Sequence, residues 1–107
     1  MKETSYRSSR ILKGLGSPVR YQIVQLLAKG KASPAQISQG VKRGVQAVSN
    51  HLAVLRSLDL VRYDVERGRI VYWLKYPAIL KILDVVEAFA DKTKTEPPER
   101  PPTVGAR

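Results

Sequence analysis

Residues 45–57 have the sequence VQAVSNHLAVLRS, and this stretch decides the fold that we expect for the chain. Its apolar residues recur with the period of a helix, and at about 100° per residue they fall within roughly 60° of Val48. The predicted buried stripe consists of Val45, Val48, Leu52 and Leu55. The stretch 45–55 contains no Asp, Glu, Lys or Arg, whereas solvated helix faces usually carry Glu and Lys. We therefore expect a helix with one buried face and one uncharged polar face.

The exposed face of this helix is suited to the major groove of DNA. Asn and Gln can bond bidentately to adenine, Ser can donate or accept, and an alanine methyl can contact a thymine methyl. The candidate base-reading residues are Gln46, Ala47, Ser49 and Asn50. Lys42 and Arg43 precede the helix and Arg56 lies near its end, so all three are candidates for phosphate contacts. The alternative is an ordinary solvated face. His51 falls at the edge of the buried stripe, which favours packing or a phosphate contact over base reading.

Three further helices are predicted before this one, at residues 5–13, 18–29 and 34–39. Ser17-Pro18 and Ser33-Pro34 are typical helix starts, because serine caps a helix and proline fits its first turn. We expect residues 14–16, Gly-Leu-Gly, to end the first helix, and Gly40 to end the third. A short helix, a glycine-containing turn and the helix 45–57 together predict a helix-turn-helix.

A β-hairpin is predicted immediately after the helix-turn-helix. Residues 61–66 and 70–75 alternate with the period of a strand, and Arg67-Gly68 provides the turn. This hairpin would be a wing, and Arg67 and Arg69 at its tip could reach the minor groove or its phosphates. A solubilising turn is the alternative. A last helix is expected over residues 77–92. The fold class is therefore mainly α with a small β-hairpin: a winged helix-turn-helix of about five helices over residues 1–92, followed by a disordered Pro-rich tail over residues 93–107.

Composition narrows the function classes. The chain has 107 residues, a net charge of +10, no cysteine and one histidine. The excess of positive charge favours a polyanion such as nucleic acid. Without thiols or a second histidine, we expect neither a metal site nor a cofactor, and without a nucleophile–base pair or a phosphate-binding loop we expect no enzyme. No signal peptide or membrane span is visible, which indicates a cytoplasmic protein without a membrane partner.

The last helix is apolar over too much of its circumference for a small domain. Its apolar residues spread over roughly 220°, whereas one core needs a stripe nearer 100°. A second subunit would bury the excess, and the first helix could join the interface. The predicted interface residues are Tyr6, Ile11, Leu12, Ile79, Leu80, Ile82, Leu83, Val86 and Phe89. An effector pocket at the same place is the alternative. Such a homodimer would bind an imperfect palindrome in double-stranded DNA, with half-sites about 34 Å apart.

Three segments in register resemble the ArsR-type (arsenic-repressor-like) winged-helix family. They are LGSPVR at residues 15–20 with IVQLL at 23–27, VSNHLAVLR at 48–56, and GRIVYWL at 68–74. The resemblance implies a homodimer built on the first and last helices that represses promoters until an effector releases it. It also implies that Gln46, Ala47, Ser49 and Asn50 face the groove and that Arg67 and Arg69 belong to the wing. The chain departs from the metal sensors of this family, since it has neither their thiolate pair nor their last-helix histidines.

These observations lead to a sequence-specific DNA-binding transcription regulator, a repressor acting as a homodimer. Two alternatives stay open at this point. One is a winged-helix module that binds a protein or an RNA, and the other is a non-specific, chromatin-like DNA binder. The sequence indicates neither the operator nor an effector.

Overall fold

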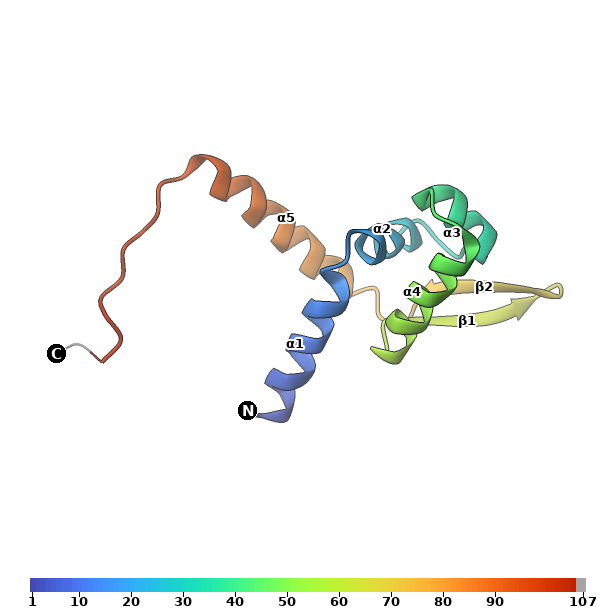
Figure 1. Ribbon diagram of the computed structural model, residues 1–107, viewed down its shortest axis with the longest axis horizontal. Helices are drawn as coiled ribbons and strands as arrows, with labels where there is room; N and C mark the ends of the chain where they lie inside the picture. Colours follow the sequence, from blue (N-terminus) through green and yellow to red (C-terminus); the bar gives the residue numbers. More distant parts are fainter. Residues whose placement is uncertain (106–107) are drawn as a thin grey trace.

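The computed structural model, which describes residues 1–105, has five helices and one antiparallel hairpin (Figure 1). The elements are α1 (Glu3–Leu15), α2 (Pro18–Leu27), α3 (Pro34–Val41), α4 (Val45–Ser57), β1 (Val61–Glu66), β2 (Arg69–Leu74) and α5 (Ile79–Thr95). The predicted fold class, a winged helix-turn-helix, is confirmed by this order and by the helix-turn-helix of α3 and α4. The helix α4 has the bounds, residues 45–57, that are expected from the sequence.

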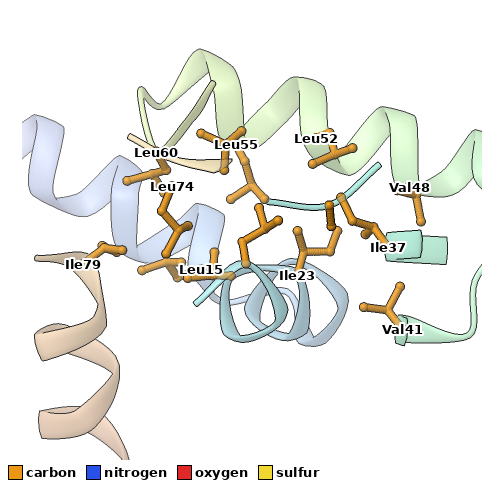
Figure 2. Packing of buried hydrophobic residues seen from close by; sticks show 14 of the residues in the cluster. Leu15, Ile23, Ile37, Val41, Val48, Leu52, Leu55, Leu60, Leu74 and Ile79 are labelled. Carbon is orange, nitrogen blue, oxygen red and sulfur yellow. The ribbon is translucent and has the colours of Figure 1, made fainter. Parts of the chain in front are cut away.

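The core lies between α2, α3, α4 and the base of the hairpin (Figure 2). Ile23 of α2, Ile37 of α3 and Leu55 of α4 are completely buried. At the open end of the hairpin, Val61 pairs with Leu74 and both are buried, so the wing is anchored where its strands begin and end. Because one apolar cluster includes residues of α4 and of both strands, the position of the recognition helix relative to the wing is fixed by packing.

Serine caps fix the starts of α2 and α3, as predicted. The Ser17 hydroxyl accepts a hydrogen bond from the Arg20 backbone N–H at 3.3 Å. In α3 the bonding is reciprocal: Ser33 Oγ accepts from the Gln36 N–H at 3.2 Å, and Gln36 Oε1 accepts from the Ser33 N–H at 2.9 Å. These bonds satisfy N–H groups that lack partners within the helix.

Two glycines expected to end helices instead lie inside them. Gly14 is part of α1, and a Cβ built there would come within 2.1 Å of a Leu58 methyl group. Gly40 is part of α3, where a Cβ would lie 3.0 Å from Leu26. The helix α1 does end within residues 14–16, at Leu15 with Gly16 as its C-cap, whereas the end expected at Gly40 was wrong. Both Gly14 and Gly40 serve the close approach of a neighbouring side chain. The helix α3 ends instead at Lys42, which has left-handed backbone angles, φ 56° and ψ 48°.

Val45 was predicted to be buried and is not: its exposed fraction is 52%, whereas Val48, Leu52 and Leu55 are at most 1% exposed. Val45 is the first residue of α4, immediately after the turn from α3. Helical phase predicts the direction of a side chain, but it does not predict where the neighbouring element ends. Val45 points in the expected direction and still stays outside the buried stripe.

The helix α5 projects away from the rest of the fold (Figure 1). The radius of gyration is 17.3 Å, whereas a compact domain of this length would have about 13 Å. The helix begins two residues after Pro77 and continues past Lys92 to Thr95, so the boundary expected at residue 93 lies inside it. Of the tail predicted over residues 93–107, the last two residues, 106–107, lie outside the described residues. Over residues 1–105, no helix is long and apolar enough to cross a membrane.

Candidate nucleic-acid interface

The polar face of α4 is exposed, as its sequence predicts. Gln46, Ser49 and Asn50 are exposed and Ala47 is half-buried. Gln46 and Asn50 are one turn apart, and Gln46 Nε2 donates a hydrogen bond to Asn50 Oδ1 at 3.3 Å. The Asn50 amide N–H groups and a second lone pair on its Oδ1 stay available. The two side chains therefore present a pre-ordered pair of amides with the donor and acceptor groups that an adenine edge requires.

The turn between α3 and α4 brings cations to the start of α4. The Arg43 backbone is held by Ser38, whose hydroxyl donates to the Arg43 carbonyl and whose carbonyl accepts from the Arg43 N–H. Lys42 and Arg43 are both exposed. The N-cap of α4 is Gly44, so no side chain caps this helix, in contrast to α2 and α3. Backbone N–H groups of its first turn are thus free to bind an anion beside two positive side chains.

The wing presents two exposed arginines at its tip. Arg67 and Gly68 form a two-residue turn in which both have positive φ, 52° and 75°, and Arg69 begins β2. Positive φ at both positions is the geometry of a type I′ turn, which suits the right-handed twist of a hairpin. The side chains of Arg67 and Arg69 therefore flank the tightest point of the wing.

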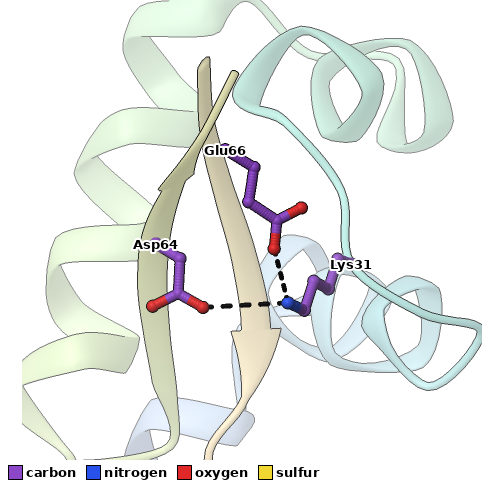
Figure 3. A network of polar contacts seen from close by, with 3 residues as sticks. All are labelled: Lys31, Asp64 and Glu66. Atoms are coloured by element: carbon purple, nitrogen blue, oxygen red, sulfur yellow. Dashed lines mark hydrogen bonds and ion pairs between the residues drawn. The ribbon is translucent and has the colours of Figure 1, made fainter. Parts of the chain in front are cut away.

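The acidic residues of the wing, Asp64 and Glu66, both pair with Lys31 (Figure 3). Lys31 precedes α3, and its Nζ lies 2.6 Å from Glu66 Oε2 and 3.7 Å from Asp64 Oδ2. The hydrogen bond to Glu66 is the main cause of the raised pKa of Lys31. Beside it, Ala32 and Tyr72 exchange backbone hydrogen bonds that attach the loop to β2. This pairing offsets one of the two negative charges that would otherwise repel a phosphate backbone near the wing.

A cleft of about 810 Å³ separates α3 from the wing. Arg67 and Arg69 line one side, and Gln39 of α3 lines the other. Sequence reasoning missed Gln39 and Lys31, because no local pattern indicates that residues some thirty positions apart lie together. The structure thus adds the edge of α3 to the candidate interface.

Arg56 is separated from the other candidate residues. It lies ten residues after Gln46, which corresponds to about 15 Å along the helix. Its guanidinium stands over the ring of Tyr63 in β1, 5.4 Å from the ring centre. The structure therefore joins Arg56 to the base of the wing and not to the group formed by Lys42, Arg43, Gln46 and Asn50.

His51 connects α4 to α2 through Arg20. Its Nδ1 lies 3.1 Å from Arg20 Nη1, and Arg20 Nε donates to the Gly14 carbonyl at 2.6 Å. Burial is the main cause of the lowered pKa of His51, with smaller contributions from the charges of Arg20 and Arg43. The half-buried imidazole agrees with the sequence expectation of a packed histidine.

We expect His51 to make the fold sensitive to mild acid. Since its pKa is lower in the folded chain than the usual value of about 6.5, the unfolded chain binds the proton more readily. The free energy of unfolding should therefore fall as the pH is lowered through 6.5, and His51→Gln should reduce that fall. Urea unfolding at pH 7.5 and 5.5 checks this. The lowered pKa of Asp59 starts from 3.8 and lies below this range. An equal pH dependence in both proteins would contradict the expectation.

The residues predicted for the dimer surface divide into exposed residues and residues that are buried within the protomer. Ile82, Val86 and Phe89 are 41%, 45% and 65% exposed, and with Val85 they form one apolar stripe along α5. Ile79 and Leu83 instead belong to the core of the protomer, where they are 6% and 4% exposed, so they offer little surface to a partner. Leu80 and Ile11 are half-buried against the same core. Ile79 and Leu83 attach α5 to its own domain, and their assignment to the interface stays a prediction.

The exposed apolar residues of α1 lie on two different faces. Tyr6 and Leu12 are 55% and 58% exposed, but six residues of helix separate them by about 120° around the axis. Leu12 is therefore a candidate for the same interface as the α5 stripe, and Tyr6 faces α4.

The carboxylates of α5 do not form a metal site. Glu87 accepts a hydrogen bond from the Tyr21 hydroxyl at 2.6 Å and one from Gln25 at 3.4 Å. The bond to Glu87 is the main reason that the pKa of Tyr21 is raised to about 12. Over residues 1–105, no group of three or more His, Asp or Glu side chains is placed to hold a metal ion.

Comparison with known proteins agrees with this geometry. Residues 15–64 match the family model described as a helix-turn-helix domain. No curated protein matches the chain. The structure is similar to that of Rv0081 from M. tuberculosis, with a TM-score of 0.80, 21% identity, and coverage of 89% of this chain and 96% of that one.

The chain is a winged helix-turn-helix protein. A second similar structure is the homodimeric DNA-binding domain of Mb0332 from Mycobacterium bovis, a possible ArsR-family transcriptional regulator (TM-score 0.76, 22% identity, coverage 94% and 96%). A third is the transcriptional repressor BigR from Xylella fastidiosa (TM-score 0.67, 26% identity, coverage 88% and 91%). The fold of these structures agrees with the resemblance to the ArsR-type family that the sequence motifs indicate.

Proposed function

We propose that this winged helix-turn-helix protein is a sequence-specific DNA-binding transcription regulator that acts as a homodimer. The helix α4 would lie in the major groove, and the wing would contact the minor groove or the backbone. The observation that carries the proposal is the hydrogen-bonded amide pair of Gln46 and Asn50, exposed on α4 between the cations of the preceding turn and those of the wing. Amides supply base readout, and the flanking cations fix the register on the phosphates.

Phosphate contacts would supply most of the affinity. Lys42 and Arg43 stand at the free N-terminus of α4, and Arg67 and Arg69 stand at the wing tip. Four such contacts in each protomer predict a steep loss of affinity with added salt, since every neutralised phosphate releases counterions. The net charge of +10 favours the same encounter at long range.

The dimer and the operator follow from the exposed stripe on α5. The structural relative Mb0332 is described as homodimeric. A two-fold dimer of this chain would present two copies of α4 to the same side of a duplex, and its operator would be an imperfect palindrome with half-sites about 34 Å apart. A role on chromosomal DNA implies a cytoplasmic location, and it requires no catalysis.

Repression is the direction of regulation that we propose. BigR, which is 26% identical over 88% of this chain, is described as a transcriptional repressor. A dimer that covers two successive major grooves can block a promoter by occupying it, without any further contact. Release would then require a signal that changes the dimer or its grip on DNA.

The test begins with selection of bound fragments from genomic DNA, followed by affinity measurements on the best site. We expect Asn50→Ala to weaken binding by roughly 10- to 100-fold on that site and much less on unrelated DNA. Arg67→Asn should weaken binding to all duplexes and lower the slope of log K against log salt by about 2, because the dimer loses one phosphate contact at each wing. Asparagine is chosen at position 67 because it tolerates the positive φ of the turn, so the wing keeps its shape.

Lys29→Gln is a matched control, since it removes a positive charge that lies at the end of α2 and outside the interface. It should leave both affinity and salt slope nearly unchanged. Equal binding to every duplex, with no effect of Asn50→Ala beyond that on random DNA, would contradict sequence-specific readout and favour a chromatin-like role. Absence of duplex binding would favour a protein- or RNA-binding module.

A further inference from the structure

A groove of about 430 Å³ lies between α1 and α4, beside the point where Gly14 meets Leu58. In Figure 1, α1 runs next to the C-terminal part of α4. Tyr6, Arg10 and Lys13 recur along one face of α1 and line the groove from that side. On α4 the groove begins at Val54, one turn beyond Asn50, and continues to Leu58, so it adjoins the end of the base-reading surface and includes none of its residues.

The groove has a strongly positive lining. Arg10, Lys13 and Arg20 all line it, and no acidic residue does. Among the described residues, the ion pairs involve only Lys31, Lys75, Lys92 and Lys94 as cations, so no carboxylate neutralises these three side chains. Cations gathered in a hollow repel one another and attract an anion.

Arg20 is the fixed member of this group. It is half-buried, its Nε donates to the Gly14 carbonyl, and its Nη1 contacts His51. These two contacts hold the guanidinium plane, so an anion would meet a donor that is already oriented. A pre-oriented donor loses less conformational entropy on binding than a free side chain does.

The remaining walls are mostly apolar, since the other polar side chains, Ser9 and Ser57, donate their hydroxyl protons to carbonyls of their own helices. Val54 and Leu58 come from α4 and Tyr6 comes from α1. Tyr6 and Val54 are 55% and 37% exposed in the protomer, so a ligand would remove apolar surface from water. Small-molecule sites typically combine such walls with a few convergent polar groups in a volume of about 300–1,000 Å³.

We propose that this groove binds a small aromatic carboxylate, whose charge meets Arg10, Lys13 and Arg20 and whose ring lies against Tyr6 and Val54. The groove is on a different face of α1 from Leu12, so a dimer formed through Leu12 and the α5 stripe leaves it open. Since α4 forms one wall, the bound molecule contacts the recognition helix itself. If the proposed DNA binding holds, such a ligand is an effector; its binding to the free protein does not depend on that function.

The test is titration of the full-length protein with 2-naphthoate, without DNA, by calorimetry and by NMR. We expect binding with shifts at Tyr6 and Val54, and a dissociation constant at least about tenfold higher in the double variant Arg10→Gln, Lys13→Gln. The control is Lys29→Gln, Lys81→Gln, which removes the same two charges from exposed positions outside the groove. It should bind 2-naphthoate as the wild type does.

Neutral 2-naphthamide and inorganic phosphate complete the experiment. We expect both to bind at least tenfold more weakly than 2-naphthoate. Equal binding of the amide would overturn the proposal, because apolar contact alone would then suffice. Equal binding of phosphate would also overturn it and would make the groove a site for phosphate, including that of a DNA backbone. No binding of 2-naphthoate in the millimolar range, or equal loss in both double variants, would overturn it as well.

Discussion

Phe89→Glu is expected to turn the dimer into a monomer while leaving the fold of the protomer intact. Phe89 is 65% exposed in the protomer, so the substitution disturbs no core contact. It is the largest and most C-terminal member of the apolar stripe on α5, where Ile82, Val85 and Val86 are also exposed. In a two-fold interface the change occurs twice, and two carboxylates are brought into an apolar surface that cannot solvate them.

The effect should be large because a buried charge is added to the loss of an aromatic contact, and an aromatic residue in an interface can by itself contribute about 2 kcal/mol. We expect the dissociation constant of the dimer to rise by two orders of magnitude or more, which corresponds to about 2.7 kcal/mol. Sedimentation equilibrium at micromolar concentration measures the change directly. Binding to a full palindrome should fall to the affinity of a single half-site.

Ala88→Glu is the matched control for this variant. It introduces the same carboxylate at the neighbouring exposed position, about 100° around the helix from Phe89. It should weaken the dimer far less. If Phe89→Glu stays dimeric, or if both variants dissociate equally, the α5 stripe is not the interface, and Leu12 of α1 becomes the place to look.

Val48→Ala should destabilise the fold by about 2 to 3 kcal/mol, because it removes two buried methyl groups from a fully packed site and leaves a cavity. Val48 has an exposed fraction of 0% and lies between α3 and α4 in the core (Figure 2). The loss would be a large part of the stability of a domain of this size. It would loosen the very helix that we assign to the major groove.

Val45→Ala makes the identical chemical change on the same helix, three residues earlier, at a side chain that is 52% exposed. We expect its effect to stay within about 0.5 kcal/mol. Urea unfolding followed by circular dichroism compares the two. Similar losses for both variants would mean that Val45 is buried after all, as its helical phase suggested.

Much of this fold could be predicted from the sequence because its signals are local. Ser33, Pro34 and Gln36 form a capping box within four residues, and the buried stripe of α4 repeats every three or four residues. Gly14 and Gly40 show where local reasoning fails. In a sequence, a glycine that ends a helix cannot be distinguished from a glycine that leaves room for a packed side chain such as Leu58 or Leu26. Only the neighbouring residue in the folded structure distinguishes the two.

The candidate site divides in the same way. Gln46, Ser49 and Asn50 follow from helical phase on a single element, and the structure exposes them as expected. The pairing of Lys31 with Asp64 and Glu66 joins segments more than thirty residues apart, so no pattern could indicate it. Likewise, Ile79 and Leu83 are buried because their side of α5 faces the core of the protomer. The sequence shows an apolar stripe that is wide enough for both a core and an interface, but it does not show which side of the stripe faces which.

The attachment of α5 has a mechanical consequence. The helix is held to its domain over its first half, by Ile79 and Leu83 and by the bond from Tyr21 to Glu87, while the rest of it projects. The eight residues beyond Glu87 span about 12 Å, so a tilt of 10° at Glu87 moves the far end by about 2 Å. In a dimer joined through α5, the tilt of this helix would set the distance between the two copies of α4. The half-site spacing that the dimer prefers in an operator would then depend on the contact between Tyr21 and Glu87, far from any base pair.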